Sequence, residues 1–104
     1  MLLTDCVIIL PMITDFSCKD TEALWNGNRV KRFVNIEHVA MRKLQQLNAA
    51  TSLDYLRIPP ANRLEALKGD RIGQYSIRIN DQWRICFAWQ DGSASQVEIV
   101  DYHD

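Results

Sequence analysis

The sequence predicts an α+β domain with a short first strand, two N-terminal helices packed on a sheet, and three to four further, largely antiparallel strands. Two observations lead to this prediction. Apolar residues recur at spacings of three and four in the first half of the chain, and at every second position after residue 74. The chain has 104 residues, 47% of them hydrophobic, which suits one compact domain with its own core.

The first 11 residues, MLLTDCVIILP, are the most apolar stretch of the chain. This run is too short to span a bilayer. No basic residue precedes it and no small-residue cleavage site follows it, so it does not resemble a signal peptide. We expect residues 1–11 to be an N-terminal extension and residues 12–104 to form a single domain that starts at Met12. The alternative is an extra edge strand.

The first predicted elements of the domain are a short strand, at residues 13–16, and a short helix that Gly27 ends. Asn35 predicts the N-cap of a longer helix with one buried stripe and with Arg42 and Lys43 facing solvent. The stripe consists of Ile36, Val39, Ala40, Leu44 and Leu47. Ser52 predicts the cap of one more helical turn.

The second half of the chain predicts a β-meander. A strand is expected at residues 64–67, and the alternating segments 75–79 and 83–90 predict a hairpin. A three-residue loop, 80–82, keeps the apolar side chains of both strands on one face, whereas a two-residue loop does not. The residues 97–100 predict the last strand.

This register places Arg78 opposite Arg84 on the polar, solvent-facing side of the sheet. Like charges in directly opposite positions are destabilising, so we expect an anion between the two side chains. Two anions fit: Glu98 from the neighbouring strand, or a phosphate that an arginine fork binds through two hydrogen bonds.

Charge and cysteine content restrict the range of possible functions only slightly. Net charge is −1, but residues 29–84 hold eleven Lys/Arg and five acids, between two acidic ends. This pattern is compatible with an anionic ligand, and equally with a solvated surface. Three cysteines, Cys6, Cys18 and Cys86, form neither a zinc motif nor a disulfide framework, and indicate a reducing compartment. We expect no metal site and no cofactor.

The chain ends with Asp101, Tyr102, His103 and Asp104. Alternation places Tyr102 on the same face as Arg78 and Arg84. An aromatic ring can stack on an unpaired base, a histidine can move a proton to or from a ribose hydroxyl, and an arginine can stabilise charge on a phosphate. These residues predict RNA chemistry. The other histidine, His38, is expected to be structural.

The segments RLEALKGDRIGQYSIRINDQWRICFAW and VEIVDYH together resemble the HigB branch of the RelE/ParE superfamily of bacterial toxins. The resemblance runs from about Met12 to His103. It implies a RelE-like fold and a cytoplasmic, ribosome-dependent endoribonuclease that cuts mRNA in the ribosomal A site. The implied reaction is attack of a 2′-hydroxyl on the adjacent phosphate, without a metal ion.

The resemblance also implies a role for individual residues. The expected catalytic residues are Arg84, His103, Tyr102 and Lys68. The expected substrate-binding residues are Arg78, Arg71, Gln82 and Asp101. The chain departs from the family pattern at Glu65, where some relatives have a histidine, and at Asp104, whose carboxylate would raise the pKa of His103.

The implied partners are a HigA-like helix-turn-helix antitoxin, mRNA and the 70S ribosome, with operator DNA bound only through the antitoxin complex and no membrane. Two alternatives stay open. A toxin of the same fold can act by binding another target such as DNA gyrase, or a weakly active toxin can serve mainly as an antitoxin-binding module.

Overall fold

The computed structural model describes residues 13–102. Residues 1–12, His103 and Asp104 lie outside this range, and with them the predicted extension, the predicted start at Met12 and the predicted catalytic histidine. The elements, in chain order, are α1 (Lys19–Trp25), η2 (Lys31–Phe33), α2 (Glu37–Ala49), α3 (Leu53–Arg57), η3 (Pro60–Asn62), β1 (Glu65–Ala66), η4 (Gly69–Arg71), β2 (Gln74–Arg78), β3 (Trp83–Gln90) and β4 (Ser93–Asp101).

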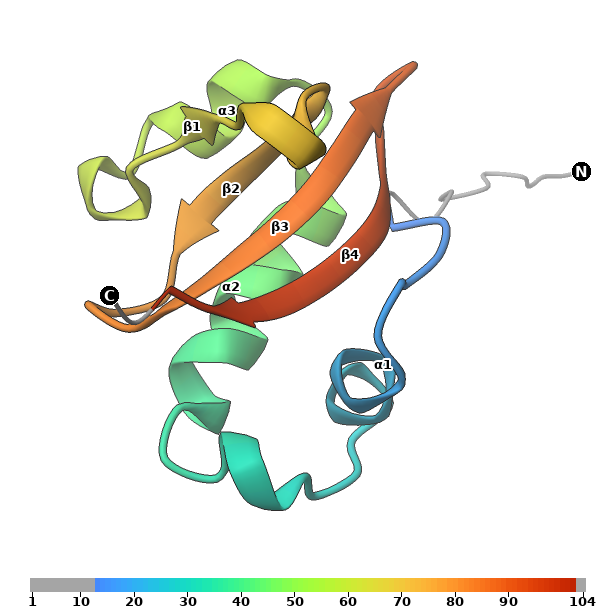
Figure 1. Ribbon diagram of the computed structural model, residues 1–104, viewed down its shortest axis with the longest axis vertical. Coiled ribbons are helices and arrows are strands. Elements are labelled where there is room, and N and C mark those ends of the chain that lie inside the picture. Colours follow the sequence, from blue (N-terminus) through green and yellow to red (C-terminus); the bar gives the residue numbers. More distant parts are fainter. Residues whose placement is uncertain (1–12, 103–104) are drawn as a thin grey trace, which may run out of the picture.

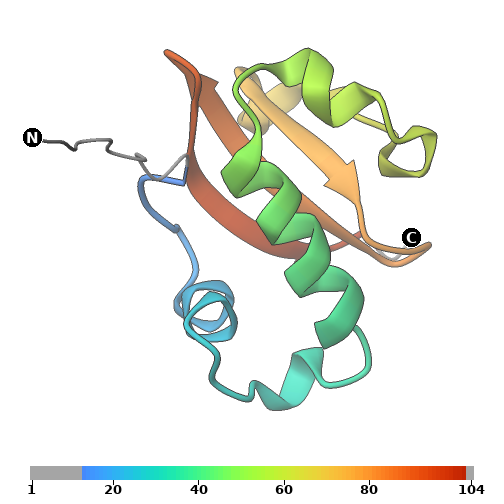
Figure 2. The same cartoon turned by 180° about the vertical axis from the view of Figure 1, so that it is seen from behind.

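The four strands form one antiparallel sheet in the order β1-β2-β3-β4. The helices α1 and α2 cover one face of it, which Figure 2 shows from the helical side, while the opposite face is turned toward the viewer in Figure 1. This is the α+β arrangement that the sequence predicts.

The predicted first strand is reduced to two isolated parallel bridges, Ile13 to Ala94 and Phe16 to Val97. The reason lies in β4, whose pairing with β3 shifts by one residue between Cys86 and Ala88. Gln96 at this shift has a left-handed φ of 53°. The resulting bulge interrupts the ladder that residues 13–16 could otherwise form along β4.

The long helix α2 buries the stripe that its periodicity predicts: Ala40, Leu44 and Leu47 are fully buried. Its predicted N-cap is wrong. Ile36 occupies the N-cap position and no side chain caps the helix. The cause is the tight turn that precedes it, in which the Ile36 amide donates to the Phe33 carbonyl at 3.0 Å.

Lys43 is the second correction on α2. The sequence predicts that it faces solvent, yet the residue is only 8% exposed. Its Nζ donates to Oδ1 of Asn62 in η3 at 2.5 Å. Position 43 lies next to the apolar stripe, and η3 folds back over it. The cap of α3 is as predicted, because Ser52 Oγ accepts from the Tyr55 amide at 3.3 Å.

The hairpin register is confirmed. Arg78 pairs with Arg84, and the Ile79 amide donates to the Trp83 carbonyl at 2.9 Å. The three-residue loop is held by Asn80, whose Oδ1 accepts from the amides of Gln82 and Trp83, both at 2.8 Å.

The apolar core lies between the sheet and the helices. Its largest fully buried side chains are Phe33, Phe87, Leu44, Leu47, Leu56, Ile77, Ile85 and Ile99. Trp83 is only partly buried and meets Phe33 edge to face, with ring centroids 5.5 Å apart. Within residues 13–102, no helix has the length and apolar character needed to cross a membrane.

Candidate functional site

An open cavity of about 290 Å³ lies at one end of the sheet, on the face that carries the Arg84 side chain. It sits where the ends of β1, β2 and β3 meet the last described residue of the chain. The residues that line it are Arg63, Glu65, Arg78, Asn80, Asp81, Arg84 and Tyr102. Three of the predicted site residues, Arg78, Arg84 and Tyr102, therefore share one cavity.

Arg84 is the most firmly held side chain of this cavity. The sequence predicts that it faces solvent, but it is only 8% exposed. Its Nε donates to Ser76 Oγ at 2.7 Å, and its Nη2 donates to the Arg63 carbonyl at 2.6 Å and to the Ser76 carbonyl at 3.4 Å. The Glu65 carboxylate lies 3.6 Å from the same Nη2. No hydrogen bond joins Nη1 to any residue of the described part of the chain.

The two cross-strand arginines differ in their partners. Arg78 forms an ion pair with Asp81, whose side chain is fully exposed. Glu98 does not lie between Arg78 and Arg84, which corrects one of the two predicted arrangements. Glu98 pairs in register with Cys86, farther along the sheet, and its carboxylate binds Arg71 Nη2 at 3.1 Å. Within residues 13–102, Asp81 forms an ion pair with Arg78, and Glu65 forms one with Arg84.

Tyr102 lies over Arg84, with the guanidinium carbon 5.9 Å from the ring centroid. Its amide donates to the Gln82 carbonyl at 2.5 Å, which fixes the last described residue against the β2–β3 loop. Its hydroxyl lies 3.8 Å from Sγ of the fully buried Cys86. Burial raises the pKa of Tyr102, so the phenol stays protonated at neutral pH.

The other predicted site residues within residues 13–102, namely Lys68, Arg71, Gln82 and Asp101, do not line the cavity. Lys68 is exposed, and its side chain makes no hydrogen bond or ion pair within residues 13–102. Arg71 is held by Glu98 and by Gln74 Oε1 at 2.9 Å. Burial acts to lower the pKa of Arg71, but hydrogen bonding to Glu98 and the attraction of nearby acidic groups together raise it. Gln82 Nε2 donates to Asp101 Oδ2 at 3.1 Å, so these two side chains support the segment that carries Tyr102.

Sequence reasoning missed several residues of the site. Alternation along β2 places Ser76 on the same face as Arg78 and could have suggested it as a partner of Arg84. Asp81 gives no signal beyond its place in a loop. Arg63 gives no signal either, because it contributes a backbone carbonyl, presented by a left-handed residue with φ of 46°.

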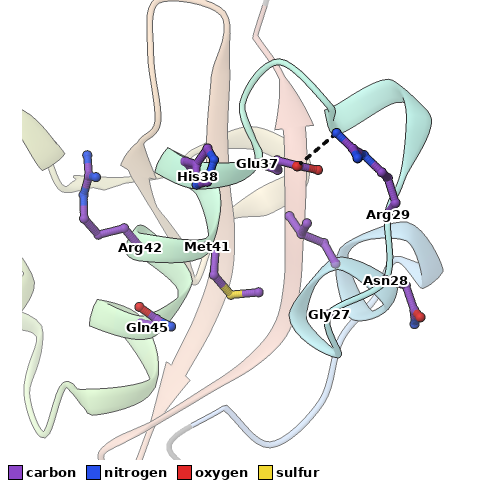
Figure 3. A pocket seen from close by; sticks show the side chains of 9 residues that line it. Gly27, Asn28, Arg29, Glu37, His38, Met41, Arg42 and Gln45 are labelled. Carbon is purple, nitrogen blue, oxygen red and sulfur yellow. Dashed lines mark ion pairs between the residues drawn. The ribbon is translucent and has the colours of Figure 1, made fainter.

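A second hollow, of about 520 Å³, lies on the helical side of the molecule, between α1 and α2 (Figure 3). Arg29 and Glu37 form an ion pair of 3.5 Å at its rim, and Met41 lies in the hollow. His38 also lines it, and its exposed side chain makes no hydrogen bond among the described residues. His38 therefore belongs to the helical layer, apart from the arginine cavity.

No group of three or more His, Cys, Asp or Glu side chains within residues 13–102 is arranged to hold a metal ion. The two described cysteines, Cys18 and Cys86, are unpaired by disulfides.

Residues 16–103 match the family model of HigB-like toxins, which is described as the RelE-like toxin of type II toxin-antitoxin system HigB. The chain is 41% identical over 85 residues to Toxin HigB-1 of Vibrio cholerae serotype O1, which covers 80% of this chain and 90% of that protein. It is 38% identical over 61 residues to Endoribonuclease HigB of Proteus vulgaris, covering 59% of this chain and 65% of that protein.

Solved structures agree on the fold. A chain of the YoeB-YefM complex from Staphylococcus aureus superimposes with a TM-score of 0.55 at 23% identity, over 92% of this chain and 100% of that chain. The YoeB dimer from the same organism gives a TM-score of 0.51 at 24% identity, over 88% and 95%. The chain thus belongs to the HigB family of RelE-like toxins of type II toxin–antitoxin systems.

Proposed function

We propose that this toxin is a ribosome-dependent endoribonuclease that cuts mRNA in the ribosomal A site. Family membership and the name of the Proteus vulgaris relative support an RNase activity. The strongest support from this chain is the arrangement of Arg84 and Tyr102. A rigidly held guanidinium, Arg84, lines an open cavity with Nη1 unengaged by the described residues, next to the ring of Tyr102.

In the proposed reaction, the ribose 2′-oxygen forms a bond to the adjacent phosphorus and the bond from phosphorus to the 5′-oxygen breaks. The 2′-hydroxyl proton leaves to a base, and an acid protonates the departing 5′-oxygen, so the products are a 2′,3′-cyclic phosphate and a 5′-hydroxyl. His103 is proposed to transfer these protons. No metal ion takes part in the proposed scheme.

The described residues have distinct proposed roles. Arg84 Nη1 donates to the phosphate and stabilises the charge that develops on it. Because Nε and Nη2 are already engaged, Nη1 is the edge left for the phosphate. Tyr102 stacks on a base beside the scissile bond. Arg78, Lys68 and Arg71 supply positive charge to the RNA backbone, and Gln82 and Asp101 hold the segment that carries Tyr102 in place.

The proposed partner that controls this activity is a HigA-like helix-turn-helix antitoxin, with operator DNA bound only through the toxin–antitoxin complex. Membership of a type II toxin family supports an antitoxin partner. The related fold in a YoeB-YefM complex supports it as well. The proposed compartment is the cytoplasm, where mRNA and ribosomes are present.

The test is cleavage of a defined mRNA on programmed 70S ribosomes, with analysis of the new RNA ends. Wild type should cut in the A-site codon and leave a 5′-hydroxyl end. His103→Ala and Arg84→Lys should lose cleavage. Arg42→Ala is the matched control, because Arg42 is an exposed arginine of α2 on the helical side, and this variant should cut like wild type.

Other outcomes would point to the alternatives. A wild-type protein that cuts no mRNA, with or without ribosomes, but still arrests growth would indicate another target such as DNA gyrase. A protein that neither cuts nor arrests growth, yet binds its antitoxin, would indicate an antitoxin-binding module.

A further inference from the structure

Lys43 is a buried cation that the proposed reaction does not use. It is 8% exposed, and no carboxylate of residues 13–102 lies within ion-pair distance of it. Within residues 13–102, the one hydrogen bond of its Nζ is to Asn62 Oδ1, at 2.5 Å. Burial lowers its pKa, and the charges of Arg42 and Arg78 lower it further. A buried charge with a single neutral partner is unfavourable by itself, so its position calls for an explanation.

The partner, Asn62, is completely buried and fully hydrogen-bonded. While Oδ1 accepts from Lys43, Nδ2 donates to Gln46 Oε1 and to the Leu56 carbonyl, both at 3.0 Å. Through these bonds Asn62 ties η3 to α2 and to the end of α3. As the last residue of η3, it stands immediately before Arg63.

Arg63 has φ of 46° and ψ of 57°, a left-handed conformation that a residue with a side chain keeps only when its surroundings fix it. On one side it is fixed by the Asn62 network, and its own amide donates to the Pro60 carbonyl at 3.2 Å. On the other side its carbonyl accepts from Arg84 Nη2 at 2.6 Å. The buried network thus ends at the guanidinium that lines the cavity.

We propose that Lys43 and Asn62 are positioning residues for Arg84. They hold η3 so that the Arg63 carbonyl engages Nη2 of Arg84, which leaves Nη1 for the phosphate. Neither residue lines the cavity or is expected to touch RNA. The inference rests on the proposed role of Arg84 in RNA cleavage, and it predicts that the helical layer controls the geometry of a site on the opposite face of the sheet.

The experiment combines NMR of the Arg84 Nε–H group with single-turnover cleavage on saturating programmed ribosomes. Lys43→Met keeps the length of the side chain and removes its donor, while Lys43→Gln restores an amide donor. In folded Lys43→Met, the Arg84 Nε–H signal should shift and exchange faster with water. Its cleavage rate should fall by up to about 100-fold, as expected for a misplaced catalytic group. Lys43→Gln should recover part of both effects.

The matched control is Thr21→Val, which removes another buried side-chain hydrogen bond between a helix and the sheet. Thr21 is fully buried, and its Oγ1 accepts from the Ile99 amide at 2.9 Å. This variant should lower the unfolding temperature and leave the Arg84 signal and the cleavage rate unchanged. Asn62→Asp, which keeps the acceptor for Lys43 but loses the Nδ2 donor, serves as a second test and should behave like Lys43→Met.

The outcomes separate this inference from the proposed function. If Lys43→Met and Asn62→Asp fold and both keep the wild-type Arg84 signal and rate, the positioning role is wrong. If the Arg84 signal moves in both variants while the wild-type protein cuts no RNA, the placement of Arg84 is supported and the ribonuclease function is overturned.

Discussion

The two faces of the sheet are both buried in part, but by different means. On the helical face, Ile77, Ile85 and Phe87 pack against apolar side chains of α1 and α2. The other face, called the polar face below, carries polar side chains. Even so, Ser76 and Cys86 are fully buried there and Arg84 is nearly so. They are covered by short irregular segments, among them the Arg63 turn, and by Tyr102.

The difference shows how the cavity obtains a fixed cation. On the helical face, burial follows from apolar area and tolerates some repacking. On the polar face, burial depends on each donor having an acceptor, because an unpaired buried polar group is costly. Removing one hydrogen bond from the polar face should therefore cost more stability, per unit of buried area removed, than removing apolar atoms from the helical face.

Phe87→Ala tests the helical face and should have the largest effect on stability. Phe87 is fully buried, and the centroid of its ring lies 6.2 Å from the ring centroid of Tyr75 and 6.3 Å from that of Trp89. We expect a loss of about 3–5 kcal/mol in the free energy of unfolding, measured by urea denaturation. Trp83→Ala should lose less, because Trp83 is only partly buried. Equal losses would show that Trp83 contributes as much to the core in solution as Phe87 does.

Ser76→Ala tests the polar face with a much smaller change in volume. It removes the acceptor of Arg84 Nε and leaves a buried N–H without a partner. We expect a loss of about 1–3 kcal/mol in urea denaturation. Ser95→Ala is the control, because Ser95 lies on β4 and its side chain makes no hydrogen bond within residues 13–102. If Ser76→Ala were as stable as Ser95→Ala, burial on the polar face would not depend on each donor having an acceptor.

The Cys86 thiol makes the stability of the protein depend on pH. Burial raises the pKa of the Cys86 thiol, partly offset by hydrogen bonding to Tyr102 and by Arg71. At pH values below the ordinary pKa of a thiol, Cys86 is neutral in the folded and in the unfolded state, and its contribution to stability is complete. As pH rises above that value the unfolded chain ionises first, so stability is lost up to the folded-state pKa. Chemical denaturation across this alkaline range should show a shallower decline for Cys86→Ala than for wild type, and parallel curves would rule the effect out.

Asp81→Ala should have the smallest effect on the fold. The Asp81 side chain is fully exposed, and exposed ion pairs contribute little to stability. Its urea curve should superimpose on that of wild type. The substitution should instead strengthen RNA binding at low salt, because it frees Arg78 next to Arg84. Binding that weakens would indicate that Asp81 orients Arg78 toward RNA rather than neutralising it.

Much of the sheet could be predicted because its side chains alternate with a fixed period. The pairing of Arg78 with Arg84 follows from that period and from the loop length alone, and so does the place of Tyr102 on the same face. The buried stripe of α2 follows from the helical period in the same way.

The predictions failed where packing between distant segments decides. The burial of Lys43 and Arg84 depends on η3 and the Arg63 turn, whose left-handed conformation no nearby residue signals. The bulge at Gln96 likewise leaves no mark in the alternation, although it reduces the first strand to two bridges.

The main-chain contacts of Arg84 have a consequence for how this family can diversify. Two of its acceptors are the carbonyls of Arg63 and Ser76, which any amino acid can supply. Position 63 can therefore change its side chain without disturbing the guanidinium, provided that the residue still adopts the left-handed turn. In relatives that keep an arginine at position 84, the side chain at position 63 should accordingly vary, and Asn or Gly should be readily tolerated at position 63.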